Sequence, residues 1–226
     1  MSLKLAIFDV DGTLVDSQAH IVAAMEQAFA SFGHAAPARG DILSIVGLSL
    51  PQAMARLAPE LAAGARAGLV DAYKDSFAAL RGGAGSSLNS PLYPGARAAL
   101  DRLAARDDVL LGVATGKSRR GLRHVLAAHG LEGMFQTVQT ADDHPSKPHP
   151  AMIGAALDDT GTDAGNAVMI GDTSFDIAMA RAAGVAAVGV SWGYHPAAAL
   201  TDAGAADVVD RFAALIPALD LIWHAT

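Results

Sequence analysis

Two carboxylates stand two positions apart near the start of the chain, at Asp9 and Asp11, directly after the apolar run of residues 3–8. A buried strand that ends in a polar loop is the natural interpretation of this pattern. The two acids can share a divalent cation there, or divide the roles of nucleophile and acid–base group. Gly12 permits a sharp turn after these acids, and Thr13 adds a hydroxyl and an amide. The alternative interpretation is that the two aspartates only cap a turn.

A second pair of carboxylates, Asp172 and Asp176, lies in the segment Gly171-Asp-Thr-Ser-Phe-Asp176, after the apolar run 167–170. Asp172 can bind a hard cation through oxygen, and Asp176 can serve the same metal or orient a nearby cation. The alternative is a helix N-cap followed by a first-turn acid that the helix dipole stabilises.

Two further loops carry groups that suit an anion. Thr115 and Gly116 follow the apolar run 109–114, where a hydroxyl and free amides at a helix N-terminus can bind phosphate or simply cap the helix. Two prolines follow Lys147 in Ser146-Lys-Pro-His-Pro150 and fix the loop around it, and its ammonium can neutralise phosphate charge. We expect the neighbouring Lys117 to be solvated.

The elements that must position these groups alternate along the chain. Each of the apolar runs 3–8, 109–114, 167–170 and 185–190 is followed by polar or glycine-rich residues and then by a helical pattern. This alternation predicts an α/β fold with a doubly wound, Rossmann-like parallel sheet covered by helices on both faces. Ligands of such sheets bind beyond the strand C-termini, so all four features should face one crevice. The expected core helices cover 94–103, 117–129, 150–159 and 174–183.

Residues 17–90 interrupt this alternation, because they show helical patterns only, at roughly 18–32, 50–57 and 60–81. A glycine- and serine-rich stretch at 82–87 follows, as is typical of a flexible linker. We therefore predict a core domain formed by residues 1–16 and 91–226. An all-helical cap domain, residues 17–90, is inserted just after the first strand.

Composition limits the class of protein. The 226 residues include 52% hydrophobic residues, which is enough for a sizeable core, and the formal charge of −7 argues against a nucleic-acid groove or a polybasic membrane surface. No apolar stretch reaches about 18 residues, and the N-terminal run is too short and too soon charged for a signal peptide. We expect a cytoplasmic protein. Without cysteine, the chain has no disulfides, thiolate zinc sites or cysteine nucleophiles.

In this order and spacing, the four motifs resemble those of the haloacid dehalogenase-like hydrolase superfamily. The first matches Asp9-Val-Asp-Gly-Thr-Leu-Val-Asp-Ser17, the second Thr115, the third Lys147 with Pro148, and the fourth Gly171-Asp-Thr-Ser-Phe-Asp176. Tyr93-Pro-Gly95 resembles the point at which the chain of this family re-enters the core after a helical cap. The most similar subgroup is that of the phosphoglycolate phosphatase-like enzymes.

The resemblance implies a magnesium-dependent phosphatase that hydrolyses a small phosphate ester, with phosphoglycolate as the first guess. In this family the residue matching Asp9 attacks phosphorus and becomes an aspartyl phosphate. The residue matching Asp11 protonates the leaving oxygen and then activates water. Mg²⁺ would be held by Asp9, the backbone carbonyl of Asp11, and Asp172. Thr115, the Gly116 amide and Lys147 would hold the phosphoryl oxygens, while Asp176 would orient Lys147 or a metal-bound water.

Several positions leave alternatives open. Gly116 stands where family members often carry Asn or Ser. His20 lies one residue early for the cap histidine of β-phosphoglucomutases, which favours a structural role. The segment Gly47-Leu48-Ser49 resembles the specificity loop of the cap, or is a simple turn between helices. Lys74 and Arg81 could meet a substrate carboxylate, although a solvated helix face is the simpler interpretation, and we expect packing roles for Trp192, Tyr194 and Trp223.

Three other functions remain in competition. A β-phosphoglucomutase-like mutase and a pyrophosphatase would use the same scaffold. A phospho-receiver signalling module is of a different class, but such modules are about half this length and lack the Asp-x-Asp-Gly-Thr motif. The expected partner is a small-molecule phosphate ester, with neither nucleic acid nor membrane, and the protein is expected to be a monomer or homodimer.

Overall fold

The computed structural model describes residues 2–82 and 90–225. Its centre is a six-stranded sheet with the order β3-β2-β1-β4-β5-β6, in which every pairing is parallel. The strands are β1 (Lys4–Phe8), β2 (Val109–Thr115), β3 (Thr137–Thr140), β4 (Ala167–Gly171), β5 (Ala186–Val190) and β6 (Asp207–Val209). The predicted doubly wound α/β fold is therefore confirmed.

Helices cover both faces of the sheet, which explains why β1 and β4 are almost continuously apolar and buried. The core helices are α5 (Ala96–Ala104), α6 (Arg119–Ala128), α7 (Ala151–Thr160), α8 (Ser174–Ala182), α9 (Ala197–Asp202) and α10 (Phe212–His224), with a short 3₁₀ turn η1 (Ala164–Asn166). Leu100 of α5 and Phe212 of α10 belong to the hydrophobic cluster on one face. Met152 of α7 and Ile177 of α8 belong to the cluster on the other.

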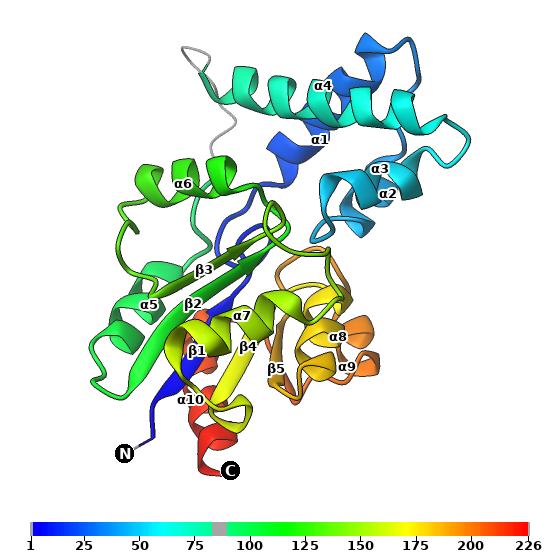
Figure 1. The fold of residues 1–226 in the computed structure, drawn as a ribbon. Coiled ribbons are helices and arrows are strands. Elements are labelled where there is room, and N and C mark those ends of the chain that lie inside the picture. Colours follow the sequence, from blue (N-terminus) through cyan, green and yellow to red (C-terminus); the bar gives the residue numbers. More distant parts are fainter. Residues whose placement is uncertain (1, 83–89, 226) are drawn as a thin grey trace.

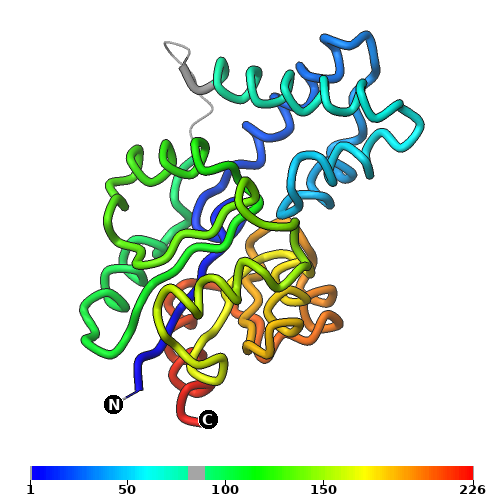
Figure 2. Tube along the Cα trace, viewed as in Figure 1, coloured from blue at the N-terminus to red at the C-terminus, as the bar shows by residue number. Residues whose placement is uncertain are grey.

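Within residues 9–82, four helices form a second body beyond the C-terminal ends of the strands (Figures 1 and 2). These cap helices are α1 (Gln18–Ser31), α2 (Arg39–Ser44), α3 (Leu50–Leu57) and α4 (Ala63–Gly82). They bury a hydrophobic cluster of their own, which includes Met25, Met54 and Leu69. The helical nature of the insertion is confirmed. The domain boundaries at 16/17 and 90/91 stay a prediction, and the glycine- and serine-rich linker lies, from residue 83, outside the described residues.

Some elements were not predicted from the sequence. The edge strand β3 has the sequence Thr-Val-Gln-Thr, and its polar side chains are buried because Asp159 accepts hydrogen bonds from Thr137 and Gln139, each at 2.7 Å. The three-residue β6 and the short helices α2 and α9 are too brief to show a period, and α10 was not predicted either. Helix α6 begins at Arg119, two residues later than predicted, because Ser118 caps it by accepting a hydrogen bond from the Gly121 amide at 3.1 Å.

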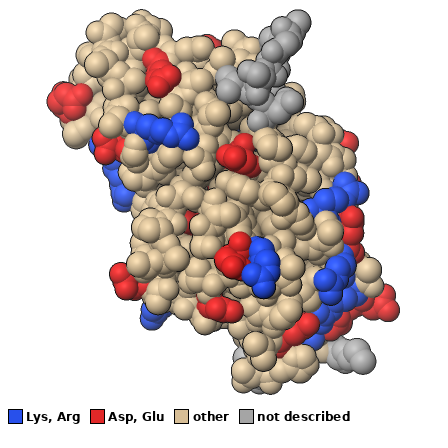
Figure 3. Space-filling model, turned by 180° about the vertical axis from the view of Figure 1, so that it is seen from behind, with Lys and Arg blue, Asp and Glu red and all other residues tan. Residues whose placement is uncertain are grey.

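The surface is mixed in charge. On the face seen in Figure 3, basic and acidic side chains stand next to one another. Ion pairs between charged side chains include Lys4–Asp108 at 3.0 Å and Arg106–Asp220 at 2.7 Å. Across residues 2–82 and 90–225, no helix is both long and apolar enough to cross a bilayer. The expected cytoplasmic location stays a prediction.

Candidate active site

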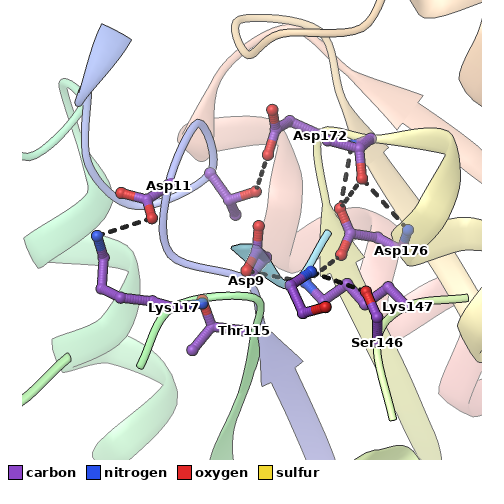
Figure 4. Close-up of polar contacts among 11 residues, drawn as sticks. Asp9, Asp11, Thr115, Lys117, Ser146, Lys147, Asp172 and Asp176 are labelled. Atoms are coloured by element: carbon purple, nitrogen blue, oxygen red, sulfur yellow. Dashed lines mark hydrogen bonds and ion pairs between the residues drawn. The ribbon is translucent and has the colours of Figure 1, made fainter. Parts of the chain in front are cut away.

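Four loops at the C-terminal edge of the sheet bring the predicted residues together (Figure 4). Asp9 follows β1, Thr115 ends β2, Lys147 lies in the loop before α7, and Asp172 follows β4. The convergence follows from the fold, because parallel strands deliver all their C-terminal loops to one edge. Asp9, Thr115, Lys147 and Asp172 are each no more than 1% exposed.

Lys147 is the electrostatic centre of this cluster. Its Nζ lies 2.9 Å from Oδ1 of Asp9 and donates a hydrogen bond of 2.6 Å to Oδ1 of Asp176. Burial lowers the pKa of the Lys147 ammonium, but the carboxylates of Asp176 and Asp9 outweigh burial and hold the pKa above its ordinary value. The lysine therefore stays charged although its side chain is fully buried.

Asp176 combines the two roles that its sequence allowed. Its Oδ2 accepts hydrogen bonds from the amide of Thr173 at 3.0 Å and from the hydroxyl of Thr173 at 2.7 Å, which completes a capping box at the start of α8. Its Oδ1 is left for Lys147. The start of α8 and the direction of the lysine are thus fixed by one carboxylate.

Asp172 is held from two sides. Its Oδ1 accepts a hydrogen bond of 2.8 Å from the Thr13 hydroxyl, and its Oδ2 accepts one of 2.9 Å from the Tyr194 amide. Gly12 takes a φ of 86° next to this carboxylate, a conformation that favours glycine. Burial and the nearby charges of Asp9 and Asp176 raise the pKa of Asp172.

The cluster has the composition of a site for a hard divalent cation. Carboxylate oxygens of Asp9, Asp172 and Asp176 lie within 4.8 Å of one another. Oδ2 of Asp9 is buried, and no described residue donates a hydrogen bond to it. Burial, together with the charge of Asp176, raises the pKa of Asp9 to about 6 even though Lys147 opposes this. Three buried carboxylates against one ammonium leave an excess of negative charge, which a cation bound through oxygen would neutralise. These residues therefore fit a divalent metal ion bound through oxygen.

Asp11 lies at the border between the sheet and the cap helices. Its Oδ1 accepts a hydrogen bond of 2.6 Å from the Ser17 hydroxyl, and its Oδ2 lies 2.8 Å from Nζ of Lys117. Ser17 occupies the N-cap position of α1, yet its hydroxyl does not cap that helix because it is committed to Asp11. The same hydroxyl lies 2.8 Å from that of Tyr194.

The expectation that Lys117 is solvated was wrong. Its side chain is only 9% exposed, since Asp11 pairs with the ammonium and the Phe77 ring of α4 lies 4.9 Å from it. Sequence reasoning also missed Ser17 and Tyr194. Ser17 was part of the first motif and could have been found as a hydroxyl near Asp11. Tyr194 was given a packing role, although its position just after β5 is where ligand-binding loops of such sheets lie.

We call the loops at the C-terminal ends of the strands, which carry Asp9, Thr115, Lys147 and Asp172, the floor of the site. Thr115 and Gly116 form the part of this floor that meets the cap. The Thr115 hydroxyl accepts a hydrogen bond of 3.2 Å from the Lys117 amide. A Cβ on Gly116 would come within 2.5 Å of the Gly47 carbonyl oxygen and 2.8 Å of the Leu48 carbonyl oxygen. The Asn or Ser that is common elsewhere in the family would not fit here without a shift of the loop 47–49.

The loop 47–49 is docked by hydrogen bonds as well as by close packing. The Ser49 amide donates a hydrogen bond of 2.7 Å to the Ser146 hydroxyl, next to Lys147. Nearby, Nε2 of His195 lies 3.1 Å from the carbonyl oxygen of Ser44. The contact places the loop against the floor, which is the position that its predicted specificity role requires, and that role stays a prediction.

Between the floor and the cap helices lies a cavity of about 160 Å³. Asp9, Asp11, Thr115, Gly116 and Lys117 line it from below. The cap side is largely apolar, with Met25, Val46, Leu48, Leu50, Tyr73 and Phe77 among the lining residues. This arrangement can hold a small molecule whose anionic end meets the floor.

His20 has a structural position, as expected. Its ring stacks on that of Phe77 with centroids 3.9 Å apart, and its Nε2 lies 3.0 Å from the Phe77 carbonyl oxygen. The side chain of Lys74 is 52% exposed and lies 3.9 Å from Asp71. The side chain of Arg81 is outside the described part of the chain. Trp192 and Trp223 pack with the sheet cluster.

Comparison with known proteins gives a consistent assignment. A sequence model described as haloacid dehalogenase-like hydrolase matches residues 6–190. The phosphoglycolate phosphatase of Rhodospirillum rubrum is 36% identical over 218 residues, which cover 94% of this chain and 89% of that protein. A Dickeya dadantii protein named probable phosphatase IndB is 34% identical over 216 residues, which cover 95% and 92% of the two chains.

A solved structure agrees. The crystal structure of a hydrolase from Pseudomonas syringae superposes with a TM-score of 0.85 at 26% identity, covering 98% of this chain and 99% of that one. The family model spans all of the motif residues described above, from Asp9 to Asp176. The chain belongs to the haloacid dehalogenase-like hydrolases.

Proposed function

We propose that this protein is a magnesium-dependent phosphatase that hydrolyses a small phosphomonoester through an aspartyl phosphate on Asp9. The observation that carries the proposal is the buried Oδ2 of Asp9, which no described residue engages. It belongs to a carboxylate that lies close to Asp172 and pairs with Lys147 through Oδ1. A carboxylate held this way, at the bottom of a cavity, is suited to attack an electrophile.

Each residue around Asp9 has a place in this reaction. As an oxygen of Asp9 bonds to phosphorus, the ester P–O bond breaks and the leaving oxygen takes a proton from Asp11. A water then attacks the same phosphorus, Asp11 takes the proton of that water, and Asp9 and phosphate are released. The proton on Asp11 is thereby restored.

Lys147, the Thr115 hydroxyl and the Gly116 amide are the groups we assign to the phosphoryl oxygens. Asp9, the Asp11 backbone carbonyl and Asp172 would hold Mg²⁺. When bound, the cation offsets the repulsion between a carboxylate and a phosphate dianion. Asp176 keeps Lys147 in position, since both of its oxygens are already engaged.

The substrate we propose is a small organic phosphate such as phosphoglycolate. The support is the cavity of about 160 Å³ and the 36% identity to a protein named phosphoglycolate phosphatase. The β-phosphoglucomutase-like alternative has less support, because His20 stacks on Phe77 and does not line the cavity.

A phosphate-release assay over a panel of small phosphate esters tests this proposal. With Mg²⁺ we expect continuous turnover, whereas a phospho-receiver module would stop after one phosphoryl group. A metal chelator should abolish phosphate release and added Mg²⁺ should restore it. Asp9→Asn, purified in the same way, should be inactive, with a loss on the order of 10⁵-fold, as when a nucleophile is removed from a preorganised site. Full activity of Asp9→Asn would overturn the mechanism.

A further inference from the structure

We propose that Lys117 selects phosphomonoesters that carry a second anionic group, such as a carboxylate, in their leaving half. The inference rests on the proposed phosphatase function and assigns a substrate class to the same site. It starts from the observation that Lys117, which follows the proposed phosphate-binding residues Thr115 and Gly116, is buried against the cap instead of being solvated.

Lys117 is placed to meet the leaving half of the substrate. Figure 4 shows Lys117 and Lys147 on opposite sides of Asp9. Lys147 is paired with Asp9 and Asp176, so it belongs to the phosphoryl end of the site. Lys117 is paired with Asp11, the residue assigned to protonate the leaving oxygen. A group attached to that oxygen therefore approaches Lys117.

The surroundings of Lys117 offer an anion little else. On the cap side most of the lining is uncharged, with Met25, Val46, Leu50, Tyr73 and Phe77, while the charged lining residues of the cap, Lys74 and Asp75, are exposed. A carboxylate buried against such a wall without a cation would be strongly unfavourable. Lys74 and Arg120 also line the cavity but are exposed on helix surfaces, whereas Lys117 is 9% exposed.

The contacts of Asp11 also favour an exchange in which a substrate anion replaces Asp11 as the partner of Lys117. One oxygen of Asp11 accepts from Ser17 and the other faces Lys117, so both are engaged as acceptors. To pass its proton to the leaving oxygen, Asp11 must present one of these oxygens to the substrate. A substrate anion can take the place of Asp11 at Lys117 and free that oxygen, while the ammonium keeps a negative partner. A phosphate ester whose leaving half is uncharged leaves the Asp11–Lys117 pair intact.

Matched substrates test this exchange. Phosphoglycolate and ethyl phosphate differ by a carboxylate in place of a methyl group. We expect the wild-type protein to prefer phosphoglycolate in kcat/KM. In Lys117→Met this preference should fall by about 10- to 100-fold, the effect of losing one charge-assisted hydrogen bond. Lys117→Arg, which keeps the charge, should retain most of the preference.

Lys74→Met is the matched control, because it removes a cation from the exposed side of the same cavity. An unchanged preference in Lys117→Met, or a loss of preference in Lys74→Met instead, would overturn the assignment. If Lys117→Met does not fold, inhibition of the wild type decides: phosphonoacetate should bind more tightly than ethylphosphonate, and equal inhibition would refute the proposal. A wild type that hydrolyses no phosphate ester refutes the proposed function itself.

Discussion

The floor of the site and the cap helices above it are built in different ways. On the floor, Lys147, Asp172 and Asp176 are fully buried, and every charged atom except Oδ2 of Asp9 has a partner delivered by a strand end. The cap side is largely apolar and meets the floor through a main-chain contact at Gly116 and a few hydrogen bonds. This difference supports our proposal that the reaction chemistry belongs to the sheet edge. It also supports the proposal that substrate choice depends on Lys117, which lies where the floor meets a cap that packs around its own hydrophobic cluster.

Among variants at the border between the two regions, the largest effect should come from Asp11. Asp11→Asn should lower kcat/KM by roughly 10²- to 10⁴-fold, the usual loss when a general acid–base group is removed. The loss should be greater for alkyl phosphates than for an aryl phosphate, whose leaving group needs less protonation. A reduction below tenfold would assign Asp11 to the metal side alone and would shift the border between chemistry and selection.

The buried carboxylates of the floor should lower the free energy of unfolding of the metal-free protein. In the metal-free protein, Asp9→Asn should raise the free energy of unfolding at pH 8 by about 1–3 kcal/mol, because it removes one buried carboxylate whose pKa is raised to about 6. The native state holds more protons than the unfolded state between the two pKa values, so the wild type loses stability as pH rises through this range.

Thermal unfolding in chelator at pH 5 and pH 8 measures the effect. The gain from Asp9→Asn should shrink at pH 5, where the native carboxyl is already protonated. Asp71→Asn, whose carboxylate is 78% exposed on α4, is the control and should change little at either pH. A variant less stable than the wild type at pH 8 would mean that the floor is not strained by its charges.

Close approach of the two regions at Gly116 gives the next test. Gly116→Ala would force its Cβ against the carbonyl oxygens of Gly47 and Leu48. Such overpacking costs about 1–3 kcal/mol, so kcat/KM should fall by roughly 10- to 100-fold as the cap is displaced. Gly154→Ala, whose Cβ would meet nothing within 4 Å, should keep wild-type kinetics. Wild-type kcat/KM in Gly116→Ala would show that turnover does not depend on this contact between the cap and the floor.

The smallest effect concerns the docking of the loop 47–49. Ser146→Ala removes the acceptor of the Ser49 amide, a hydrogen bond worth about 1 kcal/mol, and should raise KM by about fivefold with little change in kcat. Ser31→Ala removes a hydroxyl that bonds within α1 and should leave KM unchanged. A selective fall in kcat would instead place Ser146 with the chemistry of the floor.

The floor was largely predictable from the sequence, and the cap contacts were not. Asp9, Thr115 and Asp172 each follow an apolar run of strand length, so their convergence at one sheet edge followed from the parallel topology. Lys147 was identified instead by the two prolines that follow it in its loop. The local signal at Asp176 predicted a first-turn acid after a helix N-cap, and in the structure this acid forms a capping box with Thr173.

Contacts between distant segments carry no such signal. Lys117 is buried because Phe77, forty residues earlier in the sequence, packs over it, and nothing around Lys117 itself indicates this. The lack of space for a side chain at Gly116 is due to the loop 47–49, which is distant in the sequence. The strand β3 was missed because its buried polar side chains are satisfied by Asp159 on α7.

The hydroxyl of Ser17 contacts Asp11 at the expense of the stability of helix α1. A serine at the start of a helix ordinarily contributes about 1 kcal/mol by capping the first turn, but here the hydroxyl is directed to Asp11 and that turn of α1 goes without it. A search for thermostable variants would therefore favour changes near this position. Such variants are expected to resist heat better and work less well, and the first turn of α1 is best left out of any stabilising library.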